Sequence, residues 1–279
     1  MKRFFPPPFQ PEDQPKGKRP LRRLREVPLR ILVPNMITLF ALYAGLTSIR
    51  MTLESRFEYA AALIVLAGVL DALDGRAARM LKASSRFGAE LDSLADFVNF
   101  GVAPALLLYA WSLDTLGSIG WIAAILFAMS IVLRLARFNV MLDEDRPDWM
   151  GNFFVGMPAP AAAGTLLLPL YLEFVGVDHN DGMAWLILVY VVLVAYLTVS
   201  RIPTYSGKKV GIRIPRDYVV PVFGAVLLFV AFAASYFWIV LTVLAIAYLA
   251  LLPVGFVRYR QLERHHAEAA ATAGGKGAS

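Results

Sequence analysis

The sequence contains no cysteine and only three histidines. The lack of cysteine excludes disulfide bonds, thiolate metal sites and a cysteine nucleophile. His179 has Asp178 and Asp181 near it but no third ligand at metal spacing, and His265 and His266 lie in a charged terminal stretch. None of the three histidines is therefore in a pattern that predicts a metal site.

Charged residues are also scarce. They make up 17% of the 279 residues, whereas 58% are hydrophobic, and the mean hydropathy is +0.59. A soluble domain cannot bury that much apolar surface, so the composition predicts an integral membrane protein. A helix needs about 20 apolar residues to cross a bilayer. Such runs predict an all-α transmembrane bundle of about eight spans, at residues 31–49, 59–81, 87–113, 115–133, 157–172, 182–200 and, split near 235–238, two within 218–257.

The basic residues lie almost entirely on one side of these spans. Of the 27 Lys and Arg residues, 25 fall in the terminal segments, in alternate loops or at the ends of the spans beside them, and only Arg50 and Arg56 fall on the opposite side. Basic loops favour the cytoplasm, so both termini are predicted to be cytoplasmic. The net charge of +6 is then a topology signal, and we expect no nucleic-acid partner.

The chain divides into three parts by composition. Residues 1–30 are basic and proline-rich, without the apolar core of a signal peptide. This segment could lie on an anionic membrane surface or be a solvated tail that only enforces the orientation. Residues 31–258 form the predicted membrane domain, and residues 259–279 form a predicted cytoplasmic tail.

Four aspartates stand out in this apolar chain. Asp71 and Asp74 would end the second span, and Asp92 and Asp96 would begin the third, at one depth on the cytoplasmic rim. Their spacing places each pair on one helical face. Ionisable groups at membrane depth are costly, which favours a functional role. Four clustered anions need cations among them, and carboxylates suit Mg²⁺ or Mn²⁺, of which two could act on a phosphoryl group.

Glycine and arginine residues surround the aspartates. Gly75 and Gly88 would let a nucleotide approach the backbone closely because they lack side chains. Arg76, Arg79 and Arg86 supply the bidentate donors that suit phosphate. The aspartates could instead cap helices or pair with these arginines, but four at this spacing favour a functional cluster.

The acidic, glycine and arginine positions form an ordered string, Asp71-x-x-Asp74-Gly75-x-x-Ala78-Arg79, eight residues, Gly88-x-x-x-Asp92-x-x-x-Asp96. This string resembles, position for position, the motif of the CDP-alcohol phosphatidyltransferase family. The resemblance implies a membrane enzyme that displaces CMP from a CDP-linked lipid by an alcohol. It implies that Asp71, Asp74 and Asp92 ligate two divalent metal ions, and that Asp96 is the general base and also contacts a metal.

The same resemblance implies a binding site for the CDP-lipid. Gly75, Arg79 and Gly88 would line the site for the CDP phosphates and ribose. Asn35 and Thr38, at the start of the first span, would contact the cytidine; Asn35 could alternatively be an ordinary helix cap. The family resemblance also suggests a homodimer.

Stretches outside the motif narrow the resemblance to the bacterial, membrane-embedded phosphatidylserine synthases of this family. These stretches are residues 34–38 (PNMIT), 91–96 (LDSLAD), 100–104 (FGVAP), 134–139 (RLARFN) and 156–160 (GMPAP). The resemblance implies a bacterial inner-membrane enzyme that transfers the phosphatidyl group of CDP-diacylglycerol to L-serine at the cytoplasmic face. The serine carboxylate needs a cation, and Arg134 and Arg137 lie one helical turn apart at the aspartates' depth; they could instead be interfacial anchors.

Two alternatives stay open at this point. The same chemistry could use glycerol phosphate, inositol phosphate or choline as the acceptor, because only the flanking stretches separate these options. A divalent cation or proton-coupled transporter would also need buried aspartates. Transporters usually place their site near the membrane midplane between related halves, whereas these aspartates lie at one rim without a matching set in the second half.

Overall fold

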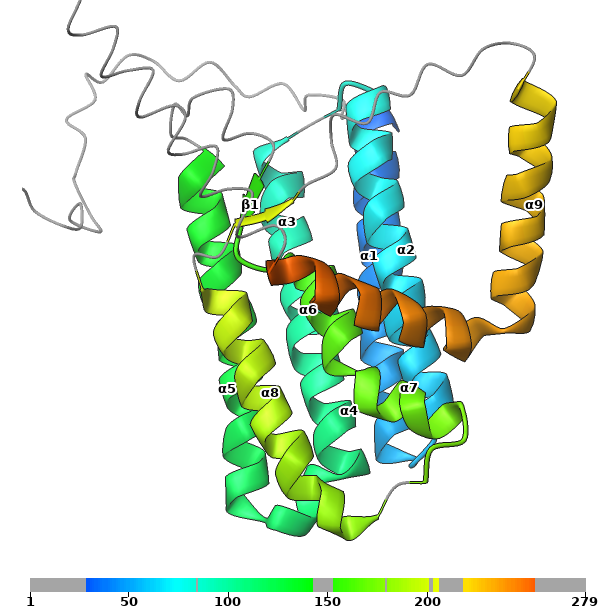
Figure 1. Cartoon of the computed structure of the whole chain (residues 1–279). Helices are drawn as coiled ribbons and strands as arrows, with labels where there is room; N and C mark the ends of the chain where they lie inside the picture. Colours follow the sequence, from blue (N-terminus) through cyan, green and yellow to red (C-terminus); the bar gives the residue numbers. More distant parts are fainter. Residues whose placement is uncertain are drawn as a thin grey trace, which may run out of the picture.

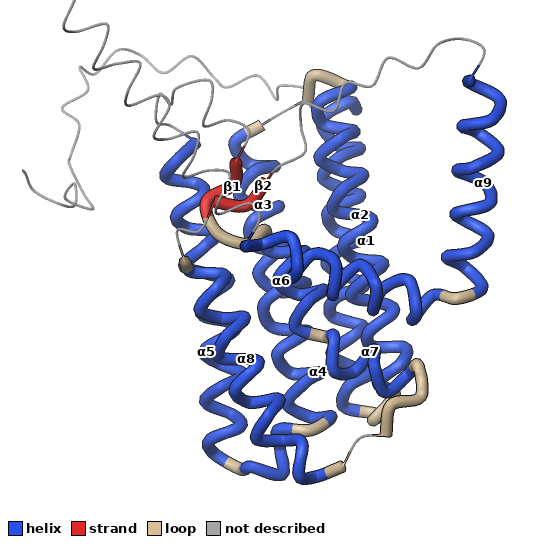
Figure 2. The backbone as a smooth tube through the Cα atoms, viewed as in Figure 1, coloured by secondary structure: helices blue, strands red, loops and turns tan. Residues whose placement is uncertain are grey.

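A computed structural model describes residues 29–83, 85–142, 153–178, 180–200, 203–205 and 218–253 of the chain. In this part the protein is a bundle of helices with one short two-stranded sheet (Figures 1 and 2). The predicted helical architecture is confirmed. Residues 1–28 of the predicted N-terminal segment, the predicted tail 259–279 and the basic loop 206–217 lie outside the described residues, whereas residues 29 and 30 already belong to the first helix.

Two antiparallel helices, α1 (Leu29–Leu53) and α2 (Phe57–Met80), form the first layer. They pack closely because small side chains meet between them, as is usual for helices in membranes. Ala41, Ala44 and Ala60 are each no more than 3% exposed. The Ser48 hydroxyl also donates a 2.8 Å hydrogen bond to the Ala60 carbonyl, which fixes the register of the pair.

The second layer begins with one long helical run. It comprises α3 (Arg86–Asp96), a π-helical turn η1 (Phe97–Val102) and α4 (Ala103–Trp111). Ser85 caps α3, since its hydroxyl accepts a 3.0 Å hydrogen bond from the Gly88 N–H. The 3-10 turn η2 (Leu113–Leu116) then leads into α5 (Ser118–Leu142). The turn between α2 and α3 therefore places the two aspartate pairs at the same end of the bundle.

The remaining helices cover this core. They are α6 (Ala159–Leu166), α7 (Leu168–Phe174) and α8 (Ala184–Val199), with a 3-10 turn η4 (Asp181–Met183) before α8. The α8 helix packs along α5, and α6 packs against η1 and α8. Strands β1 (Phe153–Val155) and β2 (Pro203–Tyr205) pair in antiparallel fashion, Phe153 opposite Tyr205, beside the start of α6.

The charge-free run near the end of the chain forms two helices, as predicted. A break at Tyr236 separates α9 (Val219–Ser235) from a helix at Phe237–Pro253, and the chain bends by 106° there. Figure 1 shows α9 beside the bundle, whereas the helix Phe237–Pro253, drawn in orange, runs across it. Only this second helix contributes to the cavity described below.

Three described helices are long and apolar enough to cross a membrane: Leu32–Leu53, Arg86–Trp111 and Ser118–Val140. The bent pair at the chain end would make a fourth. The α2 helix carries two aspartates and two arginines, α6 and α7 are separated at Leu167, and α8 has only 16 residues. The integral membrane class is thus supported, while the count of eight spans stays a prediction.

Candidate active site

Three carboxylates meet where α2 ends and α3 begins. Asp71 and Asp74 come from α2 and Asp92 comes from α3, and one oxygen of each lies within 4.8 Å of the other two. The helices run antiparallel here, so the two spaced pairs predicted from the sequence face each other across the hairpin. Oxygen atoms at this separation form a donor set that suits a hard divalent cation. The three carboxylates therefore fit the predicted metal.

Asp96 lies one turn further along α3, deeper in the bundle. Its carboxyl group is within hydrogen-bonding distance of Asp71. In the antiparallel hairpin Asp71 is likewise the deeper member of its pair. The fourth predicted aspartate thus adjoins the cluster of three, on the side that leads into the membrane domain.

The first helix holds one of these carboxylates in place. Thr38, on α1, donates a 2.7 Å hydrogen bond to Oδ2 of Asp74. Both side chains are buried, at 5% and 4% exposure. The sequence predicted that Thr38 contacts the nucleotide, but the contact made within the protein is to an aspartate. Thr38 is therefore placed to orient Asp74 whether or not it also touches a ligand.

Gly88 is required by a close approach between helices. A Cβ atom at this position would lie 2.9 Å from Oδ1 of Asn35 and 3.1 Å from the Ser85 hydroxyl. The missing side chain thus lets α3 approach α1 beside the aspartates. Asn35 consequently lies at the same rim of the bundle as Thr38.

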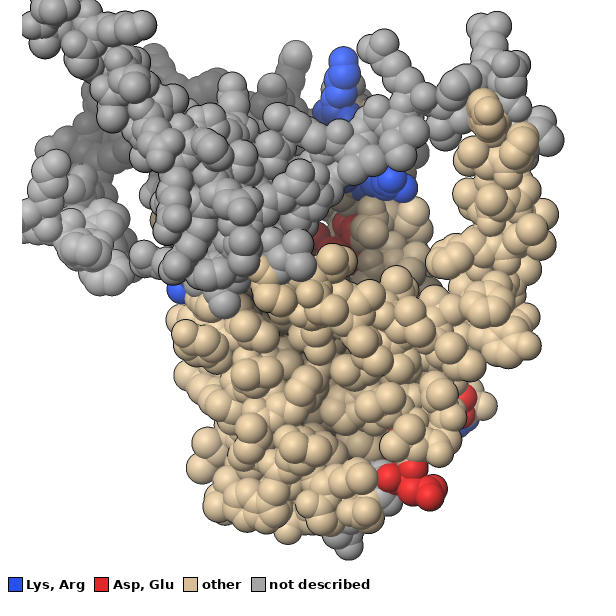
Figure 3. All heavy atoms as spheres, viewed as in Figure 1, with Lys and Arg blue, Asp and Glu red and all other residues tan. Residues whose placement is uncertain are grey.

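Arginine side chains lie at the same rim. An Nη atom of Arg79 is 3.7 Å from the place that a Cβ at Gly75 would occupy, so the guanidinium lies over that glycine. Arg76 and Arg79 are both exposed. In Figure 3, acidic side chains are visible in a recess beneath Lys and Arg side chains. The rim therefore combines recessed anions with exposed cations, as a bound diphosphate and metal would need.

The structure separates the two arginines proposed for the serine carboxylate. Arg134, on α5, is within electrostatic reach of Asp96 and Asp71, and its Nε atom is buried with no hydrogen-bond partner among the described residues. Arg137 instead donates a 2.7 Å hydrogen bond to the Val199 carbonyl at the end of α8. Arg134 therefore faces the site, whereas Arg137 ties two helices together.

A polar pair joins α3 to α5 beside the cluster. The Asn139 amide donates a 3.0 Å hydrogen bond to the Ser93 hydroxyl. Ser93 follows Asp92 directly, so this contact positions the helix that carries two of the aspartates. The pair also holds α5, and with it Arg134, against the site.

The last described helix carries no residue that the sequence motifs assigned to the site. Tyr248, on the helix Phe237–Pro253, is close enough to Arg134 to interact with it electrostatically. Together with α2 and α6, the same helix borders an apolar cavity of about 660 Å³. The last sequence stretch that resembles the family is residues 156–160, and a charge-free run offers no local signal, so the contribution of this helix is visible only in the fold.

Comparisons with known proteins agree with the motif. The CDP-alcohol phosphatidyltransferase family model matches residues 31–197, which include both aspartate pairs, and a second model, CDP-alcohol phosphatidyltransferase 2, matches residues 217–253. The chain is 42% identical over 247 residues to a CDP-diacylglycerol–serine O-phosphatidyltransferase of Mycobacterium leprae, covering 88% of this chain and 80% of that protein.

Two further relatives carry the same name. The Mycobacterium tuberculosis H37Rv protein is 39% identical over 255 residues, covering 90% of this chain and 85% of the relative. The Helicobacter pylori 26695 protein is 37% identical over 179 residues, covering 64% of this chain and 74% of the relative. The similarity therefore extends over most of the chain in the mycobacterial relatives.

Replacing one cluster carboxylate should weaken divalent cation binding. We expect Asp92→Asn to bind Mn²⁺ at least about tenfold more weakly, since even outer contacts of a metal site are typically worth 10–100-fold. Electron paramagnetic resonance of free Mn²⁺ during a titration measures this. Glu90→Gln, on the same helix but exposed, is the matched control. Equal affinity of the two variants would contradict the assignment.

Proposed function

The chain belongs to the CDP-alcohol phosphatidyltransferase family, and we propose that it transfers the phosphatidyl group of CDP-diacylglycerol to L-serine, giving phosphatidylserine and CMP. One observation carries the proposal: a cluster of carboxylates that fits divalent metal lies inside a chain similar, over most of its length, to enzymes named for that reaction. No comparable observation among the described residues supports the alternative of a divalent cation or proton-coupled transporter.

We assign the metal ligands to the aspartates. Asp71, Asp74 and Asp92 would hold Mg²⁺ or Mn²⁺, with Asp96 as a further ligand to a second ion. Bound there, the metal supplies Lewis-acid stabilisation of negative charge on the diphosphate. The protein contributes a fixed donor set, because Thr38 orients Asp74 and the Asn139–Ser93 contact holds α3.

The CDP group is assigned to the rim above this cluster. Arg79 lies over Gly75 and is exposed, which suits a phosphate contact. Gly88 opens the space beside Asn35, so the nucleotide would lie between α1 and the α2–α3 turn. The lipid-linked phosphorus would then lie next to the deeper aspartates.

Asp96 acts as the general base in this proposal. It takes the proton of the serine hydroxyl as that oxygen attacks the lipid-side phosphorus, and the bond to the CMP oxygen breaks. This is one displacement, with no covalent intermediate on the protein. Arg134 binds the serine carboxylate, because its guanidinium faces Asp96 and would hold the hydroxyl beside that base. Arg137 supports it by fixing α5 to α8.

The membrane arrangement is part of the proposal. We propose about eight spans in a bacterial inner membrane, with both termini and the aspartates at the cytoplasmic face, and the distribution of basic residues supports this orientation. We also propose a homodimer, on the basis of the family resemblance. Serine and CDP would then reach the site from the cytoplasm while the diacylglycerol stays in the membrane.

The direct experiment measures CMP release by the purified protein in detergent with CDP-diacylglycerol and Mg²⁺ or Mn²⁺. L-serine should support release, whereas glycerol 3-phosphate, inositol phosphate and choline should not. Asp96→Asn should slow turnover by roughly 10²- to 10⁴-fold, the usual contribution of a general base, while CDP-lipid binding persists.

The control for that experiment is Asp114→Asn, an exposed aspartate in η2, which should release CMP at the wild-type rate. Release with another acceptor in place of serine would keep the chemistry and overturn the serine assignment. No release with any acceptor, from folded protein, would overturn the proposed reaction.

Serine recognition can be tested separately. Arg134→Ala should raise the KM for serine by roughly tenfold or more, because a hydrogen bond to a charged group is worth about 1.5–3 kcal/mol. The KM for CDP-diacylglycerol should change little, and Arg134→Lys should restore part of the loss. Arg137→Ala should lower thermal stability more than serine affinity. A larger serine effect at Arg137 would reverse the two roles.

A further inference from the structure

The helical run that carries Asp92 and Asp96 widens directly below the candidate active site. Its π-helical turn η1 begins at Phe97, and the N–H of Ala103 donates to the carbonyl of Val98, five residues back instead of four. Single π-helical turns are rare inside α-helices and are frequent at functional sites. Because more residues occupy one turn, the side chains below Asp96 leave the helix in directions that a regular α-helix would not give.

Asn99 is the residue of this turn that meets α1. A Cβ atom at Gly45 would lie 2.0 Å from Oδ1 of Asn99 and 3.3 Å from its Cα, so the amide rests on the glycine and a side chain at position 45 would displace it. Asn99 is 1% exposed, and neither amide atom has a hydrogen-bond partner among the described residues. Burying an unpaired amide costs free energy, because the group gives up hydrogen bonds to water. Folding stability alone therefore does not account for this side chain.

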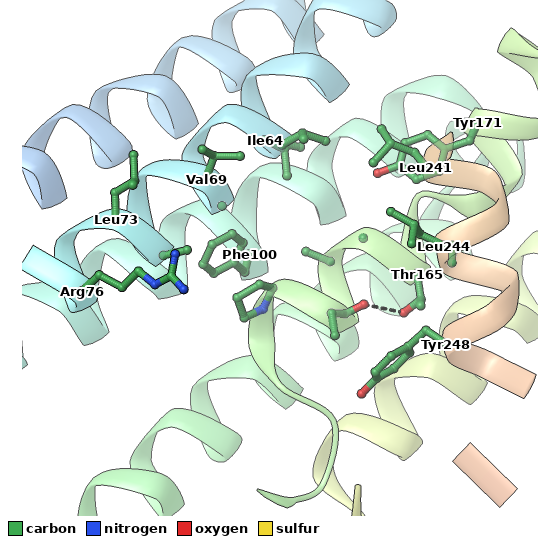
Figure 4. Close-up of a pocket in the computed structure, with 18 residues that line it drawn as sticks. Ile64, Val69, Leu73, Arg76, Phe100, Thr165, Tyr171, Leu241, Leu244 and Tyr248 are labelled. Carbon is green, nitrogen blue, oxygen red and sulfur yellow. Dashed lines mark hydrogen bonds between the residues drawn. The ribbon is translucent and has the colours of Figure 1, made fainter. Parts of the chain in front are cut away.

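The next two residues of the turn meet two further helices. A Cβ atom at Gly68, on α2, would lie 3.5 Å from the ring of Phe100, and both residues line the apolar cavity in which Figure 4 shows that ring. A Cβ atom at Gly101 would lie 3.4 Å from the side chain of Ile131, on α5. Residues 99–101 are all buried. We call them the hub, because three consecutive residues contact α1, α2 and α5.

Each side of the hub lies three residues, or about one helical turn, from a deeper residue of the candidate active site. The pairs along the chain are Asn99 with Asp96, Gly68 with Asp71, and Ile131 with Arg134. Three residues rise about 4.5 Å along a helix. The hub is therefore the layer directly beneath the proposed base, one proposed metal ligand and the proposed cation for the serine carboxylate.

Other contacts hold the end of α3 that lies nearer the α2–α3 turn. The amide of Asn139 donates a 3.0 Å hydrogen bond to the hydroxyl of Ser93. Gly88 lets the first turn of α3 approach α1 closely. Asp92 lies between these contacts, four residues farther from the hub than Asp96. A change at the hub would thus move Asp96 more than Asp92.

We propose that Asn99 is a positioning residue for catalysis: seated on Gly45, it fixes the hub so that Asp96 stays aligned with the serine hydroxyl that Arg134 holds in place. The inference deepens the proposed function and rests on it. In this role Asn99 acts through the helix that carries Asp96 and needs no contact with substrate or metal. A misplacement of about 1 Å can lower a rate by about 10²-fold, so a small shift of the helix is enough.

The first test removes the amide. Asn99→Ala should lower kcat for CMP release with L-serine, measured on the purified protein in detergent, by roughly 10- to 100-fold. The KM for CDP-diacylglycerol and the affinity for Mn²⁺ should stay within about threefold, because α3 is held independently around Asp92. The unfolding temperature should change little, because lost packing is offset by the loss of a buried unpaired amide.

The matched control for this variant is Ser112→Ala. Ser112 is also 1% exposed, and its hydroxyl also has no hydrogen-bond partner among the described residues. It follows α4 directly, at the far end of the same helical run from Asp96. Ser112→Ala should therefore keep the wild-type kcat.

The second test crowds the same contact. Gly45→Ala places a methyl group where Oδ1 of Asn99 lies, and should lower both the unfolding temperature and kcat. Gly120→Ala is its matched control, because a Cβ atom at Gly120, in the first turn of α5, would lie 2.0 Å from the carbonyl oxygen of Leu113, far from the aspartates. This control should lower the unfolding temperature and keep the wild-type kcat. Adding Asn99→Ala to Gly45→Ala should restore stability but not kcat.

The outcomes separate positioning from a purely structural role. A lower kcat in Asn99→Ala and Gly45→Ala, with the wild-type kcat in both controls, supports the proposal. A wild-type kcat in Asn99→Ala overturns it, and so does a parallel loss of kcat, CDP-diacylglycerol affinity, Mn²⁺ affinity and unfolding temperature in that variant. A wild-type protein that releases no CMP with L-serine is a different result, because it overturns the proposed reaction and this inference with it.

Discussion

The mutual repulsion of four carboxylates is the constraint on which this structure depends. Asp71, Asp74 and Asp92 have oxygens within 4.8 Å of one another, and Asp96 adjoins Asp71. Like charges this close are strongly unfavourable where water is scarce, and a divalent cation removes that cost. The surrounding protein holds the carboxylates together: small residues bring α1 against α2, and polar contacts fix the positions of Asp74 and α3.

This arrangement gives each region of the protein a distinct task. The hairpin of α2 and α3 concentrates negative charge at one end of the bundle, where exposed arginines can meet a diphosphate. The α5 helix brings Arg134 within electrostatic reach of Asp96 and Asp71. The last described helix contributes no charge to the site, yet with α2 and α6 it borders the apolar cavity. The α2 helix thus carries two of the clustered aspartates and also lines the apolar cavity.

Spacing along the sequence was sufficient to predict the aspartate cluster, because helical periodicity and one short turn determine where such residues meet. It could not distinguish Arg134 from Arg137, since residues three apart share a face only approximately and the contact of Arg137 depends on the end of α8. The link from Thr38 to Asp74 joins residues 36 apart and required the packing of α1. The apolar cavity was not predicted, because its lining is almost entirely uncharged and comes from segments far apart in the sequence. The predicted eight spans stay untested, because α8 is short, α2 carries charged residues, and α6 and α7 are separated at Leu167.

The most direct measurement is the apparent unfolding temperature of the detergent-solubilised wild type and of Asp92→Asn, each with EDTA and with Mg²⁺. We predict that Mg²⁺ stabilises the wild type in a saturable manner, as expected for a ligand that binds only the folded state. We also predict that Asp92→Asn is more stable than the wild type in EDTA, because one repelling charge is gone, and that Mg²⁺ raises the unfolding temperature of this variant little. A wild type indifferent to Mg²⁺, together with an Asp92→Asn protein less stable in EDTA, would contradict it.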